Sequence, residues 1–167
     1  LILLNGKAQR SLIEIKHLFK DCDWVRVETT RTTANIGALK AECCELAKGE
    51  ILIEVDYDDQ LVPMAVERIT DRFEASHIQF VYSDCWEYKD DGSTNTPYGT
   101  AYGWQHYQWG EDKLPINHSF PALPQYLRRI EWSPNHVRAF RKSAYEKIGG
   151  YNKEIKVGAY SVDQHAN

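Results

Sequence analysis

Two kinds of hydrophobic spacing alternate along the first half of the chain. Short apolar runs that suit buried strands stand at residues 1–4, 24–28, 50–55 and 78–84. Between them, apolar residues recur every three or four positions, as on one face of a helix, at residues 12–19, 36–47 and 61–73. This pattern predicts four strands separated by three helices.

Strands that alternate with helices of this length favour right-handed crossovers between parallel strands. The predicted fold class is therefore α/β, a doubly wound, mostly parallel, Rossmann-like sheet with helices on both faces. The apolar run LILL begins at Leu1. We therefore expect the chain to be part of a longer protein and to lack an N-terminal strand.

The spacing changes after Asp84. Residues 85–135 are rich in aromatic residues, Gly and Pro without a sustained period, which predicts a long loop or short hairpins. Regular spacing returns with a strand at 136–140 and a helix at 141–148 that Gly149 and Gly150 end. Because no segment has the composition of a linker, residues 1–167 are expected to form a single domain.

Composition narrows the classes of partner. The net charge is −4 and basic residues are mixed with acidic ones, so nucleic acid is not an expected partner. No apolar run approaches the ~18 residues that a membrane helix needs, and no signal-peptide pattern is present. The four cysteines form no C-x-x-C pair, which suits reduced thiols, and the expected location is the cytoplasm.

The acidic cluster Asp56, Asp58 and Asp59 directly follows the apolar strand at 50–55. In an open parallel sheet, ligands bind at the carboxyl ends of the strands. Carboxylates at such an end suit Mg²⁺ or Mn²⁺ that also holds a diphosphate. The alternative is that the three aspartates end the strand and cap the next helix, where negative charge is favourable.

A longer pattern surrounds this cluster. NIGALKAECCELAKGEILIEVDYDDQLVPMAVERI, followed by FVYSD, and a second segment, PNHVRAFRKSAYEKIGGYN, together resemble the family-2 glycosyltransferases of the GT-A fold. The family pattern runs N-x-G, a helix, A-x-G-[ED], an apolar strand and D-x-D-D-x-L-x-P. The residues at the matching positions are Asn35, Gly37, Ala47, Gly49, Glu50, Asp56, Asp58, Asp59, Leu61 and Pro63.

The resemblance implies a metal-dependent, inverting glycosyltransferase. Such an enzyme moves a sugar from a UDP- or GDP-sugar to a hydroxyl group of a glycan or another acceptor, as in polysaccharide synthesis. By this resemblance, residues 1–84 bind the nucleotide sugar and residues 85–167 bind the acceptor. Asp56 and Asp58 would bind Mn²⁺ or Mg²⁺, with Asp58 as the direct ligand and Asp59 in support.

Further site residues follow from the same resemblance. Asn35 belongs to the N-x-G pattern, and Asn5 and Lys40 stand near the positions where many members carry base-binding and phosphate-binding residues. An acidic general base should follow the Gly-Gly turn, and Asp163 is the candidate that would take the proton of the acceptor hydroxyl.

The aromatic residues of the irregular region suit a wall that binds the acceptor. Flat aromatic faces pack against the C–H faces of sugar rings, and an indole or phenol group can bond a hydroxyl group. The candidates are Trp104, Tyr107 and Trp109, and His136 is expected to border the same site.

Two other functions stay open from the sequence. One is a non-catalytic sugar-binding or nucleotide-binding module of the same fold, which the presence of Val162, where an acid is expected beside Asp163, favours. The other is a nucleotidyltransferase, which also uses acidic metal ligands. A nucleotidyltransferase would usually carry a Gly-rich, basic phosphate loop, and the sequence has none.

Overall fold

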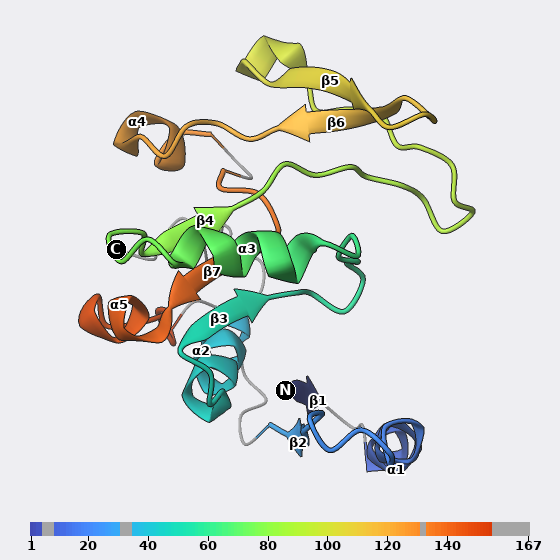
Figure 1. The fold of residues 1–167 in the computed structure, drawn as a ribbon, viewed down its shortest axis with the longest axis vertical. Coiled ribbons are helices and arrows are strands. Elements are labelled where there is room, and N and C mark those ends of the chain that lie inside the picture. Colours follow the sequence, from blue (N-terminus) through green and yellow to red (C-terminus); the bar gives the residue numbers. More distant parts are fainter. Residues whose placement is uncertain (5–8, 31–34, 131–132, 155–167) are drawn as a thin grey trace. The chain divides into compact units, whose positions relative to one another are not determined.

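The computed structural model describes residues 1–4, 9–30, 35–130 and 133–154 (Figure 1). They divide into two compact units, each described by itself below. The first unit comprises Leu1–Glu50 and the described residues from Lys142 onward, and the second unit comprises Ile51–Arg141. The predicted halves 1–84 and 85–167 concern function and stay a prediction.

The first unit contains a small parallel sheet. Its strands β1 (Ile2–Leu4) and β2 (Val27–Thr29) pair in parallel, and α1 (Gln9–Leu18) connects them. Arg26, just before β2, donates a side-chain hydrogen bond to the carbonyl oxygen of Leu46. The strand-helix-strand arrangement predicted for the start of the chain is therefore confirmed.

Two further helices belong to the first unit. Helix α2 (Ile36–Leu46) has Asn35 as its N-cap residue and Ala47 as its C-cap residue. Helix α5 (Lys142–Lys147) was expected from the apolar spacing near the end of the chain. The Lys142 ammonium donates to the carbonyl oxygen of Ala47 over 2.7 Å, so the first turn of α5 satisfies a carbonyl group at the end of α2.

The second unit contains a three-stranded antiparallel sheet. Strand β7 (Arg138–Arg141) lies in the middle, between β3 (Ile51–Glu54) and β4 (Phe80–Tyr82). It runs antiparallel to both neighbours. Its central position agrees with its burial, since Ala139 is fully buried and Phe140 is only 8% exposed.

The prediction of a doubly wound, mostly parallel, Rossmann-like sheet with helices on both faces is wrong. The strands form separate sheets instead: β1 with β2, β3 with β7 and β4, and a hairpin of β5 with β6. From the alternation of strand and helix patterns, we expected β3 and β4 to be adjacent parallel strands that α3 connects. The late strand β7 bonds to both β3 and β4 and separates them, so the pairing partner comes from far along the chain rather than from the next strand.

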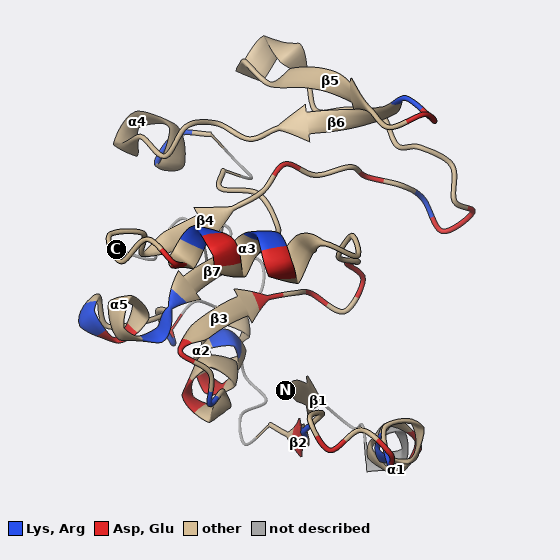
Figure 2. Cartoon of the chain, in the orientation of Figure 1, with Lys and Arg blue, Asp and Glu red and all other residues tan. Residues whose placement is uncertain are grey.

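Helix α3 (Ala65–Phe73) covers this sheet with its apolar face. Ile69 and Phe73 of α3 are buried with Ala139 of β7, and partly buried apolar side chains of the sheet and its flanks surround them. The Arg141 guanidinium lies 5.4 Å from the centre of the Phe73 ring and donates to the Ile78 carbonyl oxygen over 3.0 Å. Basic and acidic residues occupy the outer face of the helix (Figure 2).

The irregular region at 85–135 contains a hairpin. Short hairpins were one of the two forms predicted for it. A short 3₁₀ turn (Thr100–Tyr102) precedes β5 (Gln105–Trp109), which pairs antiparallel with β6 (Leu114–His118), and the short helix α4 (Pro124–Leu127) follows. None of the helices in the described part of the chain has both the length and the hydropathy to cross a bilayer.

Candidate functional site

One edge of the antiparallel sheet collects the ends of its three strands. Glu54, the last residue of β3, pairs with Arg138, the first residue of β7. Tyr82, the last residue of β4, pairs with the same arginine. The segments that follow β3 and β4 therefore start beside the segment that precedes β7. Figure 2 shows acidic residues in the segment after β3.

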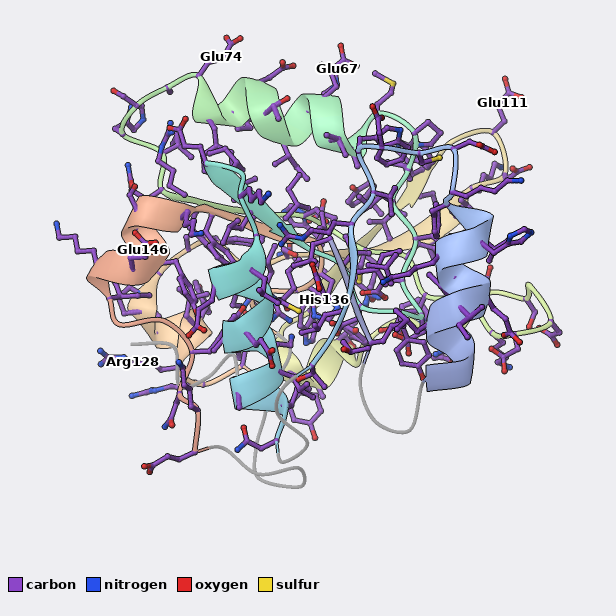
Figure 3. The ribbon with its side chains drawn as sticks, turned by 90° about the horizontal axis from the view of Figure 1, so that it is seen from below. Glu67, Glu74, Glu111, Arg128, His136 and Glu146 are labelled. Atoms are coloured by element: carbon purple, nitrogen blue, oxygen red, sulfur yellow. The ribbon has the colours of Figure 1, made fainter. Side chains whose placement is uncertain are left out.

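Three side chains from this edge form a cluster. His136 Nδ1 lies 2.9 Å from an oxygen of Asp59, and His136 Nε2 lies 3.8 Å from an oxygen of Asp56. Each of the three offers one ligand atom, and these atoms all lie within 4.8 Å of one another. Figure 3 shows the His136 side chain among other side chains, whereas the labelled Glu67 and Glu74 point outward from α3.

The turn after β3 decides which aspartates join this cluster. The backbone N–H of Asp59 bonds the carbonyl oxygen of Asp56 over 3.1 Å, which closes a turn around Tyr57 and Asp58. The residues at the two ends of the turn come together, whereas Tyr57 is 99% exposed and Asp58 is exposed at its tip. The structure thus brings Asp56 together with Asp59 rather than with Asp58, the expected direct ligand.

Backbone contacts hold His136 in place. Its N–H bonds the side-chain oxygen of Asn135 over 2.8 Å, and Asn135 is buried. The hydroxyl group of Ser83 donates to the His136 carbonyl oxygen over 3.0 Å and accepts from the N–H of Val137 over 2.9 Å. The imidazole therefore projects from a backbone that the end of β4 fixes.

The donor set of the cluster suits a transition ion. Carboxylate oxygens favour hard cations such as Mg²⁺, whereas an imidazole nitrogen favours first-row transition ions. Two carboxylates and one imidazole together fit Mn²⁺, which accepts both kinds of donor, better than Mg²⁺. Asp56 and Asp59 are 39% and 40% exposed, so ligand oxygens from outside the protein can reach them.

A second cluster centres on Asp84, just after β4. Its carboxylate accepts a hydrogen bond from the hydroxyl group of Tyr107 (2.8 Å) and another from the backbone N–H of Ser119 (2.8 Å). The Nδ1 atom of His118 lies 3.1 Å from one oxygen of Asp84 and 3.2 Å from the other. Because a carboxylate accepts hydrogen bonds, the proton of this imidazole is on Nδ1.

Tyr107 acts in this cluster as a hydrogen-bond donor. Desolvation, the hydrogen bond to Asp84 and the negative charge of Asp84 raise the pKa of Tyr107 to about 12. The phenol group therefore stays protonated throughout the neutral range. The Ser119 hydroxyl group also donates to the Ser83 carbonyl oxygen over 2.5 Å, which ties β6 to the end of β4.

The expected acceptor-binding aromatics divide into two kinds. Trp104 is only 5% exposed, and its ring makes edge contacts with the rings of Tyr98 and Phe120, so it packs inside the second unit. Tyr107 and Trp109 on β5 are 43% and 54% exposed. They leave apolar ring surface available to a ligand, while the role of an acceptor wall stays a prediction.

The N-x-G pattern has a structural role in the first unit. The Asn35 side chain accepts from the N–H of Ala38 (2.7 Å) and donates to the carbonyl oxygen of Lys153 (2.8 Å). A Cβ atom on Gly37 would lie 2.0 Å from the carbonyl oxygen of Asn152. Asn35 therefore caps α2 and, with Gly37, docks the segment after α5 against the start of that helix.

Of the remaining candidates, the structure describes only Lys40, which belongs to the first unit. The Lys40 ammonium lies 6.0 Å from the centre of the Tyr151 ring, a cation–π distance. Asn5 and Asp163 fall outside the described residues. The roles of Asn5, Asn35 and Lys40 toward a nucleotide, and that of Asp163 as a base, stay predictions.

Two residues of this edge had no place in the predicted site. Asp84 ends the apolar run at 78–84, so its position at a strand's carboxyl end was a usable signal. His118 lies 34 residues from Asp84, and the antiparallel bridge between their neighbours Cys85 and Asn117 brings the two side chains together. No spacing in the sequence marks that contact.

Comparison with protein families and with curated proteins finds no relative. No protein-family model matches the chain, and no curated protein matches it. The function must therefore be argued from the two clusters.

Proposed function

We propose that the protein is a Mn²⁺-dependent glycosyltransferase that uses a nucleotide-sugar donor and a hydroxyl acceptor. The observation that carries this proposal is the cluster of Asp56, Asp59 and His136, whose ligand atoms lie within 4.8 Å of one another. The resemblance of the D-x-D-D segment to family-2 glycosyltransferases supports the donor class. UDP- and GDP-sugars are the first candidates.

The residues of the cluster have distinct tasks in this proposal. Asp56, Asp59 and His136 would hold the cation, and a divalent cation there would neutralise the charge that develops on the departing diphosphate. His136 faces a different carboxylate with each ring nitrogen, so one of these nitrogens would give up its contact to hold the metal. Ser83 and Asn135 keep the backbone of His136 fixed during that exchange.

A titration of Mn²⁺ tests the cluster directly. Isothermal titration of the wild type should show binding at one site. Asp56→Asn, Asp59→Asn and His136→Gln should each weaken it by at least about tenfold, because each replaces a carboxylate or an imidazole with a neutral amide, a weaker ligand. Asp58→Asn is the matched control, since Asp58 lies exposed at the tip of the same turn. Its affinity should stay within about twofold of wild type.

The control also separates two metal sites. Equal losses in Asp58→Asn and Asp56→Asn, with none in Asp59→Asn, would restore the pair Asp56 and Asp58 and contradict the cluster. Mg²⁺ should bind more weakly than Mn²⁺ because of the imidazole nitrogen.

Turnover tests the reaction class. The protein is incubated with Mn²⁺, a panel of UDP- and GDP-sugars and a panel of free mono- and disaccharides as acceptors. Release of nucleoside diphosphate from one donor, abolished by EDTA and restored by Mn²⁺, is the expected result. Donor binding without any release would contradict the transferase and favour the non-catalytic binding module.

A further inference from the structure

The Asp84 cluster has the form of a general-base site. We propose that His118, held by Asp84, is the catalytic base that takes the proton of the acceptor hydroxyl group. This inference rests on the proposed glycosyl transfer, and it gives the role of base to His118 of β6, within the second unit, in place of Asp163.

The two ring nitrogens of His118 face different surroundings. Nδ1 contacts both oxygens of Asp84, at 3.1 and 3.2 Å. No hydrogen bond from Nε2 to another described residue is present, and the side chain is 52% exposed. With the proton on Nδ1, the Nε2 atom carries a lone pair toward solvent. A carboxylate that fixes one nitrogen and leaves the other as a base is the arrangement that general-base catalysis requires.

Asp84 is itself fixed, so it can orient the imidazole. Tyr107 and the Ser119 backbone donate to its two oxygens, each over 2.8 Å. The ring of Tyr107 also meets the ring of His118 edge-on, with ring centres 6.0 Å apart. These contacts restrict the His118 side chain although half of it is exposed. The same contacts stabilise the imidazolium ion that forms when Nε2 takes a proton.

The Asp84 cluster and the cluster of Asp56, Asp59 and His136 lie on chain segments that contact each other. Ser83, the neighbour of Asp84, bonds the backbone of His136 and Val137 with its hydroxyl group. The strand register pairs Tyr82, the last residue of β4, with Arg138, the first residue of β7. The proposed base, beside the last residue of β4, and the cation site, beside the first residue of β7, therefore belong to the same edge of one unit.

The proposed step balances as an inverting transfer. The acceptor oxygen forms a bond to the anomeric carbon of the donor sugar while the bond from that carbon to the diphosphate oxygen breaks. The electron pair of the broken bond leaves with the diphosphate. The proton of the acceptor hydroxyl passes to His118 Nε2, and Asp84 balances the positive charge of the imidazolium.

The test compares His118→Ala with wild type in the turnover assay above, using Mn²⁺, the UDP- and GDP-sugars and the saccharide acceptors. The variant should release nucleoside diphosphate about 10²- to 10⁴-fold more slowly, the usual contribution of a general base. Mn²⁺ affinity and melting temperature should not change. Added imidazole should restore a substantial part of the rate, which a purely structural role would not allow.

Two further variants guard the interpretation. His118→Asn keeps an N–H donor for Asp84 but lacks the base, so it should fold and lose turnover as His118→Ala does. His77→Ala is the matched control, because His77 is also exposed on the second unit and should leave turnover unchanged. Asp84→Asn should reduce the rate less than His118→Ala does.

The outcomes separate the base from the reaction class. A wild type that binds no Mn²⁺ and consumes no donor overturns the proposed function and this inference together. A wild type that turns over while His118→Ala and His118→Asn keep at least one third of its rate overturns the base alone. Loss of turnover that imidazole fails to restore also overturns the base and leaves the metal-dependent transfer standing.

Discussion

At the scale of single residues, short turns decide which side chains can act together. Asp58 and Asp59 are neighbours in the sequence, yet the bond from Asp59 N–H to the Asp56 carbonyl oxygen turns one toward His136 and leaves the other exposed. The composition of the D-x-D-D segment indicated an acidic site. It did not indicate which pair of acids would converge, because that depends on the backbone hydrogen bond that closes the turn from Asp56 to Asp59.

Cys85 gives a prediction about reactivity at this scale. Desolvation, with the nearby charges of Glu87 and Asp84, raises the pKa of Cys85 to about 11, although the Asn117 and Tyr98 side chains lower it in part. The thiol therefore stays protonated at pH 8, and its alkylation by iodoacetamide should be about 100-fold slower than that of free cysteine, whose pKa is about 8.5. Mass spectrometry of the Cys85 peptide measures the rate.

The sign of the pH effect is fixed by the raised pKa of Cys85. The thiolate fraction should rise about tenfold per pH unit from pH 8 to pH 10, and the alkylation rate with it. Unfolding in urea should remove the difference from free cysteine. A folded protein whose Cys85 reacts at pH 8 as fast as free cysteine would contradict the burial of this thiol.

At the scale of elements, close backbone contacts explain parts of the sequence pattern that looked functional. Gly37 is buried in α2, and the carbonyl oxygen of Asn152 occupies the space where a Cβ atom would lie. Asn35 bonds the next residue of the same segment, Lys153. The N-x-G pattern and the segment after the Gly-Gly turn are thus related by packing within the first unit.

Gly37→Ala should therefore destabilise the protein strongly. The added methyl group would lie 2.0 Å from a backbone oxygen, which cannot rotate away as a side chain can. We expect the free energy of unfolding to fall by at least about 2 kcal/mol, as for other overpacked sites, measured by urea denaturation. Gly99→Ala is the control, since its Cβ atom would meet only the Tyr102 ring at 3.5 Å.

Alanine at the control position, Gly99, should have little effect on stability. Gly99 has a backbone conformation that other residues adopt, so alanine there should change the free energy of unfolding by less than about 0.5 kcal/mol. Equal effects at the two glycines would mean that the segment at 152–153 does not pack against α2.

Most individual elements could be predicted from the sequence, but their pairing could not. The apolar spacing located α2 and α3 and the strands at 51–54 and 138–141, because each needs only a local pattern of burial. The insertion of β7 between β3 and β4 depends on contacts more than 50 residues apart. The Asp84–His118 pair likewise depends on the distant bridge between Cys85 and Asn117, so local periodicity carried no information about it.

At the scale of the whole molecule, the two clusters belong to one compact unit. Asp56, Asp59, Asp84, His118 and His136 all fall within Ile51–Arg141. The first unit is assembled from both ends of the described chain, whereas the second is one continuous stretch. A ligand held by the clusters alone should therefore stabilise the second unit selectively, since binding lowers the free energy of the state that binds.

Hydrogen exchange with added Mn²⁺ tests this selectivity. Amides at 55–60 and 134–138 should exchange more slowly with Mn²⁺, because the metal holds the turn after β3 and the segment before β7. Amides of α2 should exchange at the same rate with and without Mn²⁺. The Asp59→Asn variant should show no protection at either segment, and equal protection across both units would contradict a site confined to the second.

The central position of β7 has a consequence for synthesis on the ribosome. When β4 has emerged, about 56 residues must still be translated before Arg138 follows, which takes about 3 to 11 seconds at about 5–20 residues per second. During that interval β3 and β4 have no strand between them, and their N–H and C=O groups remain open to pairing with other nascent chains. Chaperone binding to the nascent chain should therefore prevent aggregation most effectively during this interval. It should no longer be needed for this purpose once residues 138–141 leave the exit tunnel.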